Sequence, residues 1–396
     1  MKNKVLLIRP RNIYGLNNYP SLGLIHLTTE LKMRGFNPHI IDCAMHRQPH
    51  VEIIKHLHDT LLIGVTMLTS ECPDAYKILT ALKEVSRIPV VVGGWHPTLF
   101  PSQMICSGLV SHVITGFGDQ AIVSLAEGIQ RGDSTIPAVI SGSGEDIAYT
   151  GRPMYGLHPA IGSLIKRPLT DIGPSSVHGR NLRWLPYQSS TGCPSRCKFC
   201  CNVVADQNKW HARTAEQTVR DMTVMAIIWW LNHIKVVDDN FFVDIERICD
   251  IDRRLSQEYH KWTWDAECRA DSLGRNRISL AKLLKLKTTG LIQLTIGIES
   301  GSQKSLDLMR KGITLEQAEE AVARCNEARI YARCSFIVEV PGESSEDIEL
   351  TRKFVNKLRR KYKYFTCGVQ TFRPYPKCEL TEELVESGQL LSLIHI

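Results

Sequence analysis

The strongest constraint on the fold of this chain is a repeated alternation between short apolar segments and longer amphipathic ones. In the first 130 residues the apolar segments are residues 4–10, 38–42, 61–66 and 88–94. Apolar, β-rich segments separated by segments with a helical period are typical of a parallel sheet covered by helices on both faces. Residues 1–145 are therefore predicted to form a Rossmann-like or flavodoxin-like doubly wound α/β domain.

The alternation stops in the middle of the chain and then resumes. Residues 146–183 gain Gly, Pro and Ser and lose their period, which predicts a linker between two domains. Residues 184–390 repeat strand and helix signals in the pattern of a partial (β/α)6 TIM-like barrel, whose chemistry takes place just beyond the strand ends. The expected helices are residues 214–232, 245–259, 280–289, 315–328 and 346–360.

The last six residues, LSLIHI (391–396), follow neither a helix nor a strand pattern. We expect them to be a non-native tail, because one reading frame of a transposon end used in sequencing libraries encodes this peptide. On this hypothesis the gene is truncated, and a segment beyond the barrel that contributes to substrate specificity is missing.

Composition and charge argue against several classes of protein. No apolar run approaches the roughly 18 residues of a membrane-spanning helix, so we predict no membrane span and a cytoplasmic location. The 13 cysteines are scattered apart from one cluster, which favours a reducing compartment with one metal or redox site over a disulfide framework. The net charge of +7 is modest and the basic run Lys357–Tyr364 has a helical period, which argues against a nucleic-acid partner.

The cysteine cluster, STGCPSRCKFCCN at residues 190–202, is the site that needs a chemical explanation. Cys193, Cys197 and Cys200 form C-x3-C-x2-C directly after a strand signal. Three thiolates from one loop suit an iron-sulfur cube, because each holds one iron corner and leaves the fourth iron open for a ligand. An open coordination position marks chemistry, as it does in catalytic zinc sites.

Two simpler readings of this loop remain open. Cys197 and Cys200 could share a zinc ion with a distant pair of ligands, or could form a C-x-x-C redox couple. Neither reading explains Cys193, and the sequence has no second C-x-x-C pair. Cys201 is predicted to be a packing residue, because consecutive side chains diverge.

With this loop and its strand, the chain resembles the radical S-adenosylmethionine (radical SAM) enzymes. The resemblance implies a 4Fe-4S cluster whose open iron binds SAM, and cleavage of SAM to a 5′-deoxyadenosyl radical by one electron. Phe199 matches the aromatic residue that the family carries near the adenine. An external one-electron reductant of the flavodoxin or ferredoxin type is implied as a partner.

The same resemblance extends to four further strand ends. It implies that Asp238, Asp239 and Asn240 hold the SAM ammonium, and that Glu267 and Arg269 face its ribose and carboxylate. Further contacts with the ribose and adenine are implied for Glu299, Ser300, Pro341 and Gly342. The chain departs from the family at Glu339, where relatives usually have glycine, and this puts the adenine contact there in doubt.

The first domain resembles the cobalamin-binding domain of one large branch of these enzymes. The matching segments are residues 19–36, 40–42, 64–70, 90–101 and 112–129. Small and polar residues at strand ends let a large flat macrocycle approach closely. The expected cobalamin contacts are Thr66, Thr69, Ser70, Gly93, Gly94 and Gly116.

The cobalt is expected to lack a protein imidazole. There is no D-x-H-x-x-G motif, and Asp42 with His46 has the wrong spacing for one. His96 is expected to be a loop residue hydrogen-bonded to backbone rather than a ligand. The competing interpretation of this domain is a degenerate Rossmann fold that binds no cofactor.

We interpret the chain as a cobalamin-dependent radical SAM enzyme that methylates an unactivated carbon of a small-molecule substrate. The first alternative is oxidative cyclisation in the style of the anaerobic porphyrin ring cyclases. A methylthiotransferase fits less well, because Cys43, Cys72 and Cys106 lie too far apart to hold a second cluster. A non-enzymatic iron-sulfur binding or sensing module leaves the segments around Asp238 and Glu267 without a role.

Replacing any one of Cys193, Cys197 and Cys200 with alanine is expected to abolish the cluster, because each thiolate holds one iron corner. Cys201→Ala is the matched control and is expected to keep an iron content near that of the wild type. Iron and sulfide analysis of anaerobically reconstituted protein measures both effects. Loss of the cluster in Cys201→Ala would overturn the ligand assignment.

Overall fold

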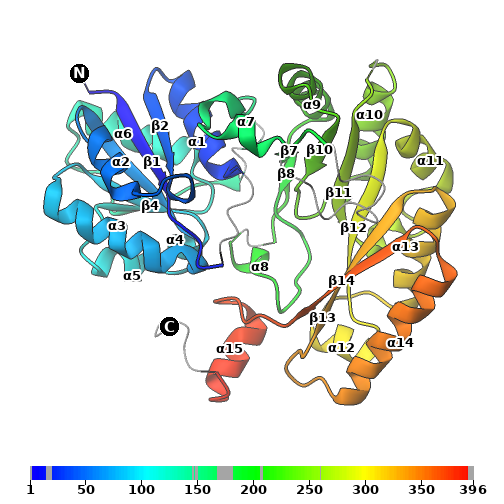
Figure 1. The fold of residues 1–396 in the computed structure, drawn as a ribbon. Helices are drawn as coiled ribbons and strands as arrows, with labels where there is room; N and C mark the ends of the chain where they lie inside the picture. Colours follow the sequence, from blue (N-terminus) through cyan, green and yellow to red (C-terminus); the bar gives the residue numbers. More distant parts are fainter. Residues whose placement is uncertain are drawn as a thin grey trace. The chain divides into compact units, whose positions relative to one another are not determined.

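The structure is a computed structural model that describes residues 2–14, 20–144, 147, 150–166, 182–205, 208–258 and 260–390. The chain divides into two compact units, Met1–Leu164 and Ile165–Ile396 (Figure 1). Each unit is built on its own six-stranded parallel sheet, as the alternation in the sequence predicts. The predicted tail, residues 391–396, lies outside the described residues.

The sheet of the first unit has the strand order β2-β1-β3-β4-β5-β6. This is the flavodoxin-like order of a doubly wound sheet, extended by one strand, and it reverses direction between β1 and β3. The predicted fold class is confirmed. The strands are β1 (Lys4–Arg9), β2 (Asn37–Asp42), β3 (Thr60–Thr66), β4 (Val90–Gly93), β5 (His112–Thr115) and β6 (Val139–Ser141).

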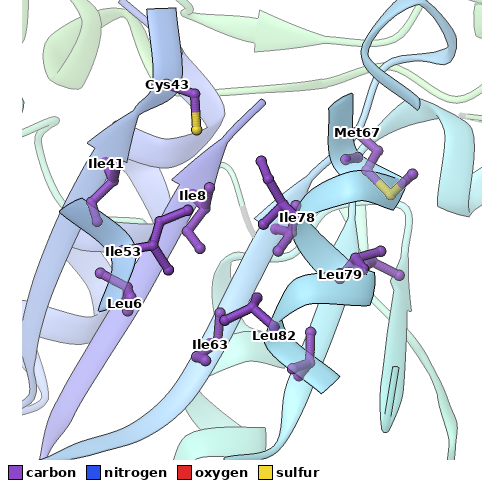
Figure 2. Packing of buried hydrophobic residues seen from close by; sticks show 14 of the residues in the cluster. Leu6, Ile8, Ile41, Cys43, Ile53, Ile63, Met67, Ile78, Leu79 and Leu82 are labelled. Atoms are coloured by element: carbon purple, nitrogen blue, oxygen red, sulfur yellow. The ribbon is translucent and has the colours of Figure 1, made fainter. Parts of the chain in front are cut away.

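Helices cover both faces of this sheet because its strands are apolar on both sides. In β1, Leu6 and Ile8 pack in one buried cluster with residues of the second, third and fifth helices (Figure 2). Val5 and Leu7 pack in another cluster with residues of the first and sixth helices. Alternate side chains of a strand point to opposite faces, so a strand buried on both sides reads as a continuous apolar run. The helices are α1 (Leu22–Met33), α2 (Pro49–His56), α3 (Cys72–Val85), α4 (Trp95–Leu99), α5 (Pro101–Cys106) and α6 (Asp119–Arg131), with 3-10 turns η1 (Cys43–Met45) and η2 (Thr69–Glu71).

The chain that follows β6 still belongs to the first unit. It contains η4 (Tyr155–Leu157) and α7 (Ile161–Leu164). The Gly151 amide donates to Glu30 Oε1 at 2.7 Å, and the Met154 amide donates to Thr29 Oγ1 at 2.9 Å, so both bonds reach α1. Within the predicted linker 146–183, residues 151–164 therefore belong to the packed first unit, while residues 146, 148–149 and 167–181 lie outside the described residues.

The second unit carries its strands in chain order across the sheet, β14-β13-β12-β11-β10-β7. Sequential parallel strands joined by helices are the arrangement of a partial barrel, as predicted. These strands are β7 (Trp184–Tyr187), β10 (His233–Val236), β11 (Thr263–Arg269), β12 (Leu291–Glu299), β13 (Tyr331–Val338) and β14 (Phe365–Thr371). An antiparallel pair, β8 (Ser190–Thr191) and β9 (His211–Ala212), brackets the cysteine loop.

Three of the longer helices of the second unit begin at capping boxes. The capping residues are Thr214, Thr314 and Ser344, and the hydroxyl of each accepts a hydrogen bond from the backbone amide three residues later. The side chain of that later residue (Gln217, Gln317 or Asp347) accepts in turn from the backbone amide of the capping residue. Such capping boxes satisfy amides that lack a partner in the first turn. The helices are α8 (Asn202–Ala205), α9 (Ala215–Trp229), α10 (Ile245–Leu255), α11 (Leu280–Thr288), α12 (Gln303–Leu308), α13 (Leu315–Glu327), α14 (Ser345–Lys361) and α15 (Glu379–Glu386), with a 3-10 turn η5 (Ala270–Leu273).

The five helices that the sequence predicts in this unit correspond to α9, α10, α11, α13 and α14, with ends that differ by a few residues. The short helices α8 and α12 and the terminal helix α15 have no counterpart among the predictions. In the part of the chain that the structure describes, every helix is too short or too polar to cross a membrane.

The stability of the first unit is expected to depend on the cluster in Figure 2. Ile8→Ala removes a side chain that is fully buried, and is expected to lower the free energy of unfolding by about 2–5 kcal/mol. Ile54→Ala on α2 is the matched control, because Ile54 is 56% exposed; its expected effect is within about 0.5 kcal/mol. Urea unfolding of the full chain measures both, and equal losses would contradict this packing.

Candidate functional site

The cysteine loop runs from β8 to β9 in the second unit. Cys197 is buried, and Cys193 and Cys200 are half-buried. Gly192 begins the loop with φ +78°, a conformation that favours glycine, and its amide donates to Asp239 Oδ2 at 2.8 Å. The end of β10, where Asp239 lies, therefore holds the start of the cysteine loop.

Asp238 is fully buried and anchors the chain just before the loop. Its carboxylate accepts from the Ser189 amide, the Ser189 hydroxyl and the Ser190 hydroxyl, each at 2.6 Å. Burial raises the pKa of Asp238, and the positive charge of Arg247 and these donors act against that rise. With its oxygens engaged in this way, Asp238 holds the chain that leads into the loop, and its contact with the SAM ammonium stays a prediction.

Asn240 lies beside the cysteine loop with one polar atom unsatisfied. Its Nδ2 faces Cys193 Sγ at 4.0 Å. Its Oδ1 is buried and has no hydrogen-bond partner among the described residues. A buried acceptor without a donor is costly, and a ligand ammonium at this position would satisfy it.

Glu267 is a third carboxylate near this loop whose pKa is raised. It lies in β11 two residues before Arg269, at the carboxyl end of the strand. Desolvation by the surrounding protein raises the pKa of Glu267 to about 7, and the positive charge of Lys235 partly opposes this rise. Its carboxylate makes no hydrogen bond within the described residues, so it is free to accept one from a ligand.

A buried polar network lies along the same face of β10 and β11. His233 Nε2 is 2.9 Å from Asp265 Oδ1, and Lys235 Nζ donates to Asp265 Oδ2 at 3.1 Å. Opposite charges and hydrogen bonds are what make buried ionisable groups tolerable. The sequence analysis missed this network, although alternate polar residues in the otherwise apolar segments HIKV and TWDAECR signal it.

Arg269 reaches the cysteine loop from the end of β11. Its Nη1 donates to Cys197 Sγ at 3.5 Å and its Nη2 to the Lys311 carbonyl at 2.7 Å. Asp271 Oδ1 accepts from Nε at 3.0 Å and fixes the guanidinium from the other side. The structure therefore brings Arg269 to the predicted site, with its donors directed to the loop itself.

Glu299 ends β12 in a strained, buried conformation. Its φ is +76°, and its carboxylate accepts from Lys311 Nζ at 2.7 Å and from Ser335 Oγ at 3.0 Å. Residues held in the left-handed region cluster at functional sites. Gly297 makes room for this pair, because a Cβ there would lie 2.5 Å from Glu299 Oε1.

Lys311, the partner of Glu299, also lies close to the cysteine loop. Its Nζ is 5.7 Å from the centre of the ring of Phe199, which is a residue of that loop. Ser300, by contrast, is buried in a local turn. Its hydroxyl lies 2.9 Å from Thr351 Oγ1 and accepts from the Ser302 amide at 3.1 Å. We conclude that Ser300 shapes the end of β12, whereas Glu299 is connected through Lys311 to Phe199, a residue of the cysteine loop.

The turn after β13 holds Pro341 and Gly342, which are partly exposed and exposed respectively. Glu343 ties this turn down: it accepts from the Val340 amide at 3.2 Å and from Ser305 Oγ on α12 at 2.8 Å. Glu339 is exposed with φ +61°, so the position that departs from the family pattern does require a conformation that glycine adopts without strain.

No group of three or more His, Cys, Asp or Glu side chains is arranged to hold a metal ion within the described ranges. The three thiols of the loop nevertheless supply the donor set that an iron-sulfur cube needs. Cys201 is half-buried next to them. Ligation by Cys193, Cys197 and Cys200 therefore stays a prediction from their spacing.

In the first unit, the loops after β1, β3 and β4 meet at the carboxyl edge of the sheet. Asn12 Nδ2 donates to Ser70 Oγ at 2.8 Å, and the Ile13 amide donates to the Ser70 carbonyl at 3.1 Å. Gly94 has φ +98°, and a Cβ there would lie 3.1 Å from both Thr66 Oγ1 and the Met67 carbonyl. The predicted residues Thr66, Ser70 and Gly94 are thus brought together where strand order reverses.

Thr69 and His96 form a pair at the same edge. Their Oγ1 and Nδ1 atoms are 3.3 Å apart, so the partner of the His96 imidazole is a side chain, while the His96 amide donates to the Met67 carbonyl at 3.0 Å. Burial lowers the pKa of His96, which keeps its imidazole neutral. His96 Nε2 is buried without a partner among the described residues, so it can bond to a ligand.

Gly93 and Gly116 serve the packing of the loops. The Gly116 amide donates to Thr98 Oγ1 at 3.0 Å, and a Cβ at Gly116 would lie 2.8 Å from the Gly142 carbonyl. Gly93 is less crowded, with the Ile114 carbonyl 3.5 Å from its Cβ position. These contacts account for both glycines by local packing, and direct contact with a macrocycle remains a prediction.

The first unit also exposes apolar side chains at this edge, namely Ile13, Tyr14 and Leu68. Asp42 does not face His46; its Oδ2 accepts from Arg9 Nη1 at 3.2 Å, and its Oδ1 accepts from the Ala44 amide at 3.1 Å. An exposed apolar rim with the unpartnered His96 nitrogen fits a large amphipathic ligand.

Two protein family models match the chain in its two units. The model described as the Radical SAM superfamily matches residues 187–355, and the model described as the B12 binding domain matches residues 13–126. The chain therefore carries a radical SAM domain together with a B12-binding domain. These two domains imply a 4Fe-4S cluster, SAM and cobalamin as cofactors, and the unsatisfied Asn240 and His96 atoms fit polar ligands in the two sites.

Several known proteins are similar to this chain over nearly its whole length. An uncharacterized methyltransferase of Pyrococcus horikoshii is 26% identical over 98% of this chain and 85% of its own. The anaerobic magnesium-protoporphyrin IX monomethyl ester cyclase of Rubrivivax gelatinosus is 22% identical over 96% of this chain and 70% of its own. The fold resembles that of the radical SAM methyltransferase TsrM from Kitasatospora setae, solved with cobalamin and a [4Fe-4S] cluster bound, with a TM-score of 0.75 at 18% identity over 98% of this chain and 78% of that one.

The raised pKa of Glu267 predicts a pH-dependent stability of the ligand-free radical SAM unit. Below the ordinary glutamate pKa, the Glu267 side chain is protonated in both the folded and the unfolded state. Between that value and a pH of about 7, Glu267 ionises in the unfolded state but stays largely protonated in the folded state. The free energy of unfolding therefore falls as the pH rises through this range. Glu267→Gln is therefore expected to stabilise the protein by about 1–3 kcal/mol at pH 8 and by little at pH 4. Urea unfolding at the two pH values measures the difference, and identical pH curves for wild type and variant would contradict the assignment.

Proposed function

We propose that this radical SAM enzyme catalyses cobalamin-dependent methylation of an unactivated carbon in a small-molecule substrate. The proposal rests on two features that occur in one chain. One is a C-x3-C-x2-C loop that follows the first strand of a partial barrel, and the other is a B12-binding domain. The Pyrococcus relative, whose similarity covers nearly the whole chain, is likewise named a methyltransferase.

When bound, the cluster and SAM supply a deoxyadenosyl radical that abstracts hydrogen, and cobalamin supplies the methyl group. The chain itself contributes acceptors at the SAM site. Asn240 Oδ1 is a buried acceptor without a donor, and Glu267 is an acceptor without a hydrogen bond, so the pair suits the ammonium and hydroxyl donors of SAM. Binding of a cation beside Glu267 favours its ionised form and offsets the desolvation that raises its pKa.

A second candidate function is oxidative cyclisation. It is favoured by the likeness to the anaerobic cyclase of Rubrivivax gelatinosus, which covers 96% of this chain. The two functions share the same cofactors and differ in the fate of the substrate radical. They are distinguished by whether SAM is consumed as a methyl donor as well as a radical source.

The proposal includes an external one-electron reductant of the flavodoxin or ferredoxin type and a cytoplasmic site of action. A one-electron donor is needed because the chemistry of SAM cleavage consumes an electron. The thirteen cysteines all lie in the described part of the chain and form no disulfide there, which is compatible with a reducing compartment.

The test is anaerobic reconstitution with iron, sulfide and hydroxocobalamin, followed by desalting and incubation with SAM and a chemical reductant. Iron, corrin, 5′-deoxyadenosine and S-adenosylhomocysteine are then quantified. Methyl transfer predicts retained cobalamin and S-adenosylhomocysteine formed at least in proportion to it. Cys197→Ala is the control and is expected to form no 5′-deoxyadenosine, because it lacks a cluster ligand.

Formation of 5′-deoxyadenosine without S-adenosylhomocysteine would contradict methyl transfer and favour the cyclase-like chemistry. A cluster with no retained cobalamin would overturn the role of the first unit as well. Absence of both SAM products from wild-type protein with a full complement of iron would contradict the assignment of radical chemistry.

A further inference from the structure

The C-terminal helix α15 packs against the cysteine loop of its own unit. The Leu380 amide donates to the Lys198 carbonyl at 3.1 Å, and the Lys198 amide donates to the Met309 carbonyl at 3.0 Å. Lys198 lies between Cys197 and Cys200, so backbone hydrogen bonds hold this part of the loop from two sides. One side is the start of α15 and the other is the end of α12.

Four charged side chains add to these backbone bonds. Lys198 Nζ donates to Glu383 Oε1 at 2.5 Å and lies 3.4 Å from Glu379 Oε1. Arg310 donates through both Nη atoms to the two oxygens of Glu379, at 2.7 and 2.6 Å. A two-pronged arginine–carboxylate pair fixes orientation as well as distance. We call Lys198, Arg310, Glu379 and Glu383 the loop clamp.

The clamp continues into the residues around the SAM site. Arg310 is followed by Lys311, whose carbonyl accepts from Arg269 and whose Nζ donates to Glu299. A shift of α15 would therefore act on the same short turn that supports Arg269 and Glu299. The cysteine loop, the end of β11 and the end of β12 share one support.

We propose that the loop clamp positions the cysteine loop for holding the 4Fe-4S cluster, so that α15 is a cluster-retaining element of this enzyme. The inference rests on the proposed assignment of the three cysteines as cluster ligands. A single exposed ion pair contributes little to stability. Here the four charges share partners and act on a loop that two backbone bonds already orient, so their effect falls on the geometry of the three thiols.

The first test is the rate at which a chelator removes iron from the reconstituted full chain. In the double variant Glu379→Gln, Glu383→Gln, the visible absorbance of the cluster is expected to disappear about five-fold faster than in the wild type, the change that corresponds to loss of one well-formed exposed pair. Lys198→Met is expected to behave like the double variant. Lys198→Arg, which keeps the charge, is expected to restore slow loss.

The matched control is Glu319→Gln on α13. Glu319 accepts from Lys357 at 2.5 Å and from Lys361 at 2.8 Å, so it has a similar pattern of ion pairs away from the cysteine loop. Loss of iron from this variant is expected at the wild-type rate. Equal rates in all variants, or equal acceleration in the control, would overturn the proposal.

The second test does not need the cluster. Hydrogen exchange of the Leu380 amide in iron-free protein is expected to speed up in the double variant and to stay unchanged in Glu319→Gln. Unchanged exchange at Leu380 in both variants would show that the charges do not hold α15 on the loop. If wild-type protein takes up no cluster, the proposed function fails, and this exchange measurement still decides whether the clamp exists.

Discussion

The candidate SAM site depends on one buried carboxylate, that of Asp238. It receives three hydrogen bonds from Ser189 and Ser190, the residues that lead into the cysteine loop. Arg247 closes this arrangement from α10, because its guanidinium donates to Ser189 Oγ at 2.9 Å and to the Arg213 carbonyl at 2.8 Å. Removing one partner from a buried network of this kind leaves an uncompensated charge, typically at a cost of about 3–5 kcal/mol. The loop that carries the chemistry is thus attached to the rigid part of the unit.

Charge is distributed differently on the two sides of the cysteine loop. On the β10 and β11 side, desolvation raises the pKa of Glu267 to about 7, and its contact with a cationic ligand stays a prediction. On the β12 side, Glu299 is already neutralised by Lys311 at 2.7 Å. A carboxylate without a cationic partner can bind a positively charged cofactor, whereas a carboxylate that is already paired with a lysine stabilises the fold. The environments of the two glutamates differ because Lys311 Nζ donates to Glu299 at 2.7 Å, whereas the charge of Lys235 only partly opposes the desolvation of Glu267.

Much of the fold could be predicted from the sequence, because hydrophobic periodicity is a local property. The alternation of apolar and amphipathic segments predicted both parallel sheets and most of the longer helices. Flavodoxin-like strand order in the first unit could not be chosen over other doubly wound orders, since strand order depends on contacts between distant segments. The stretch from Gly151 to Leu164 also escaped prediction, as its attachment to α1 comes from single hydrogen bonds that leave no periodic signal.

The sequence by itself determined the cysteine spacing, the strand-end motifs and the two series of elements, all of which are encoded within short stretches of chain. Only the tertiary structure decided which of the acidic residues are engaged and which are open. Asp238 meets its serine partners across 48 and 49 positions of the chain, and Lys198 meets Glu383 across 185. Neither pairing can be recognised in the local sequence. The fold brings particular strand ends and helices to the same edge of the sheet, and this arrangement determines the partner of each charged side chain.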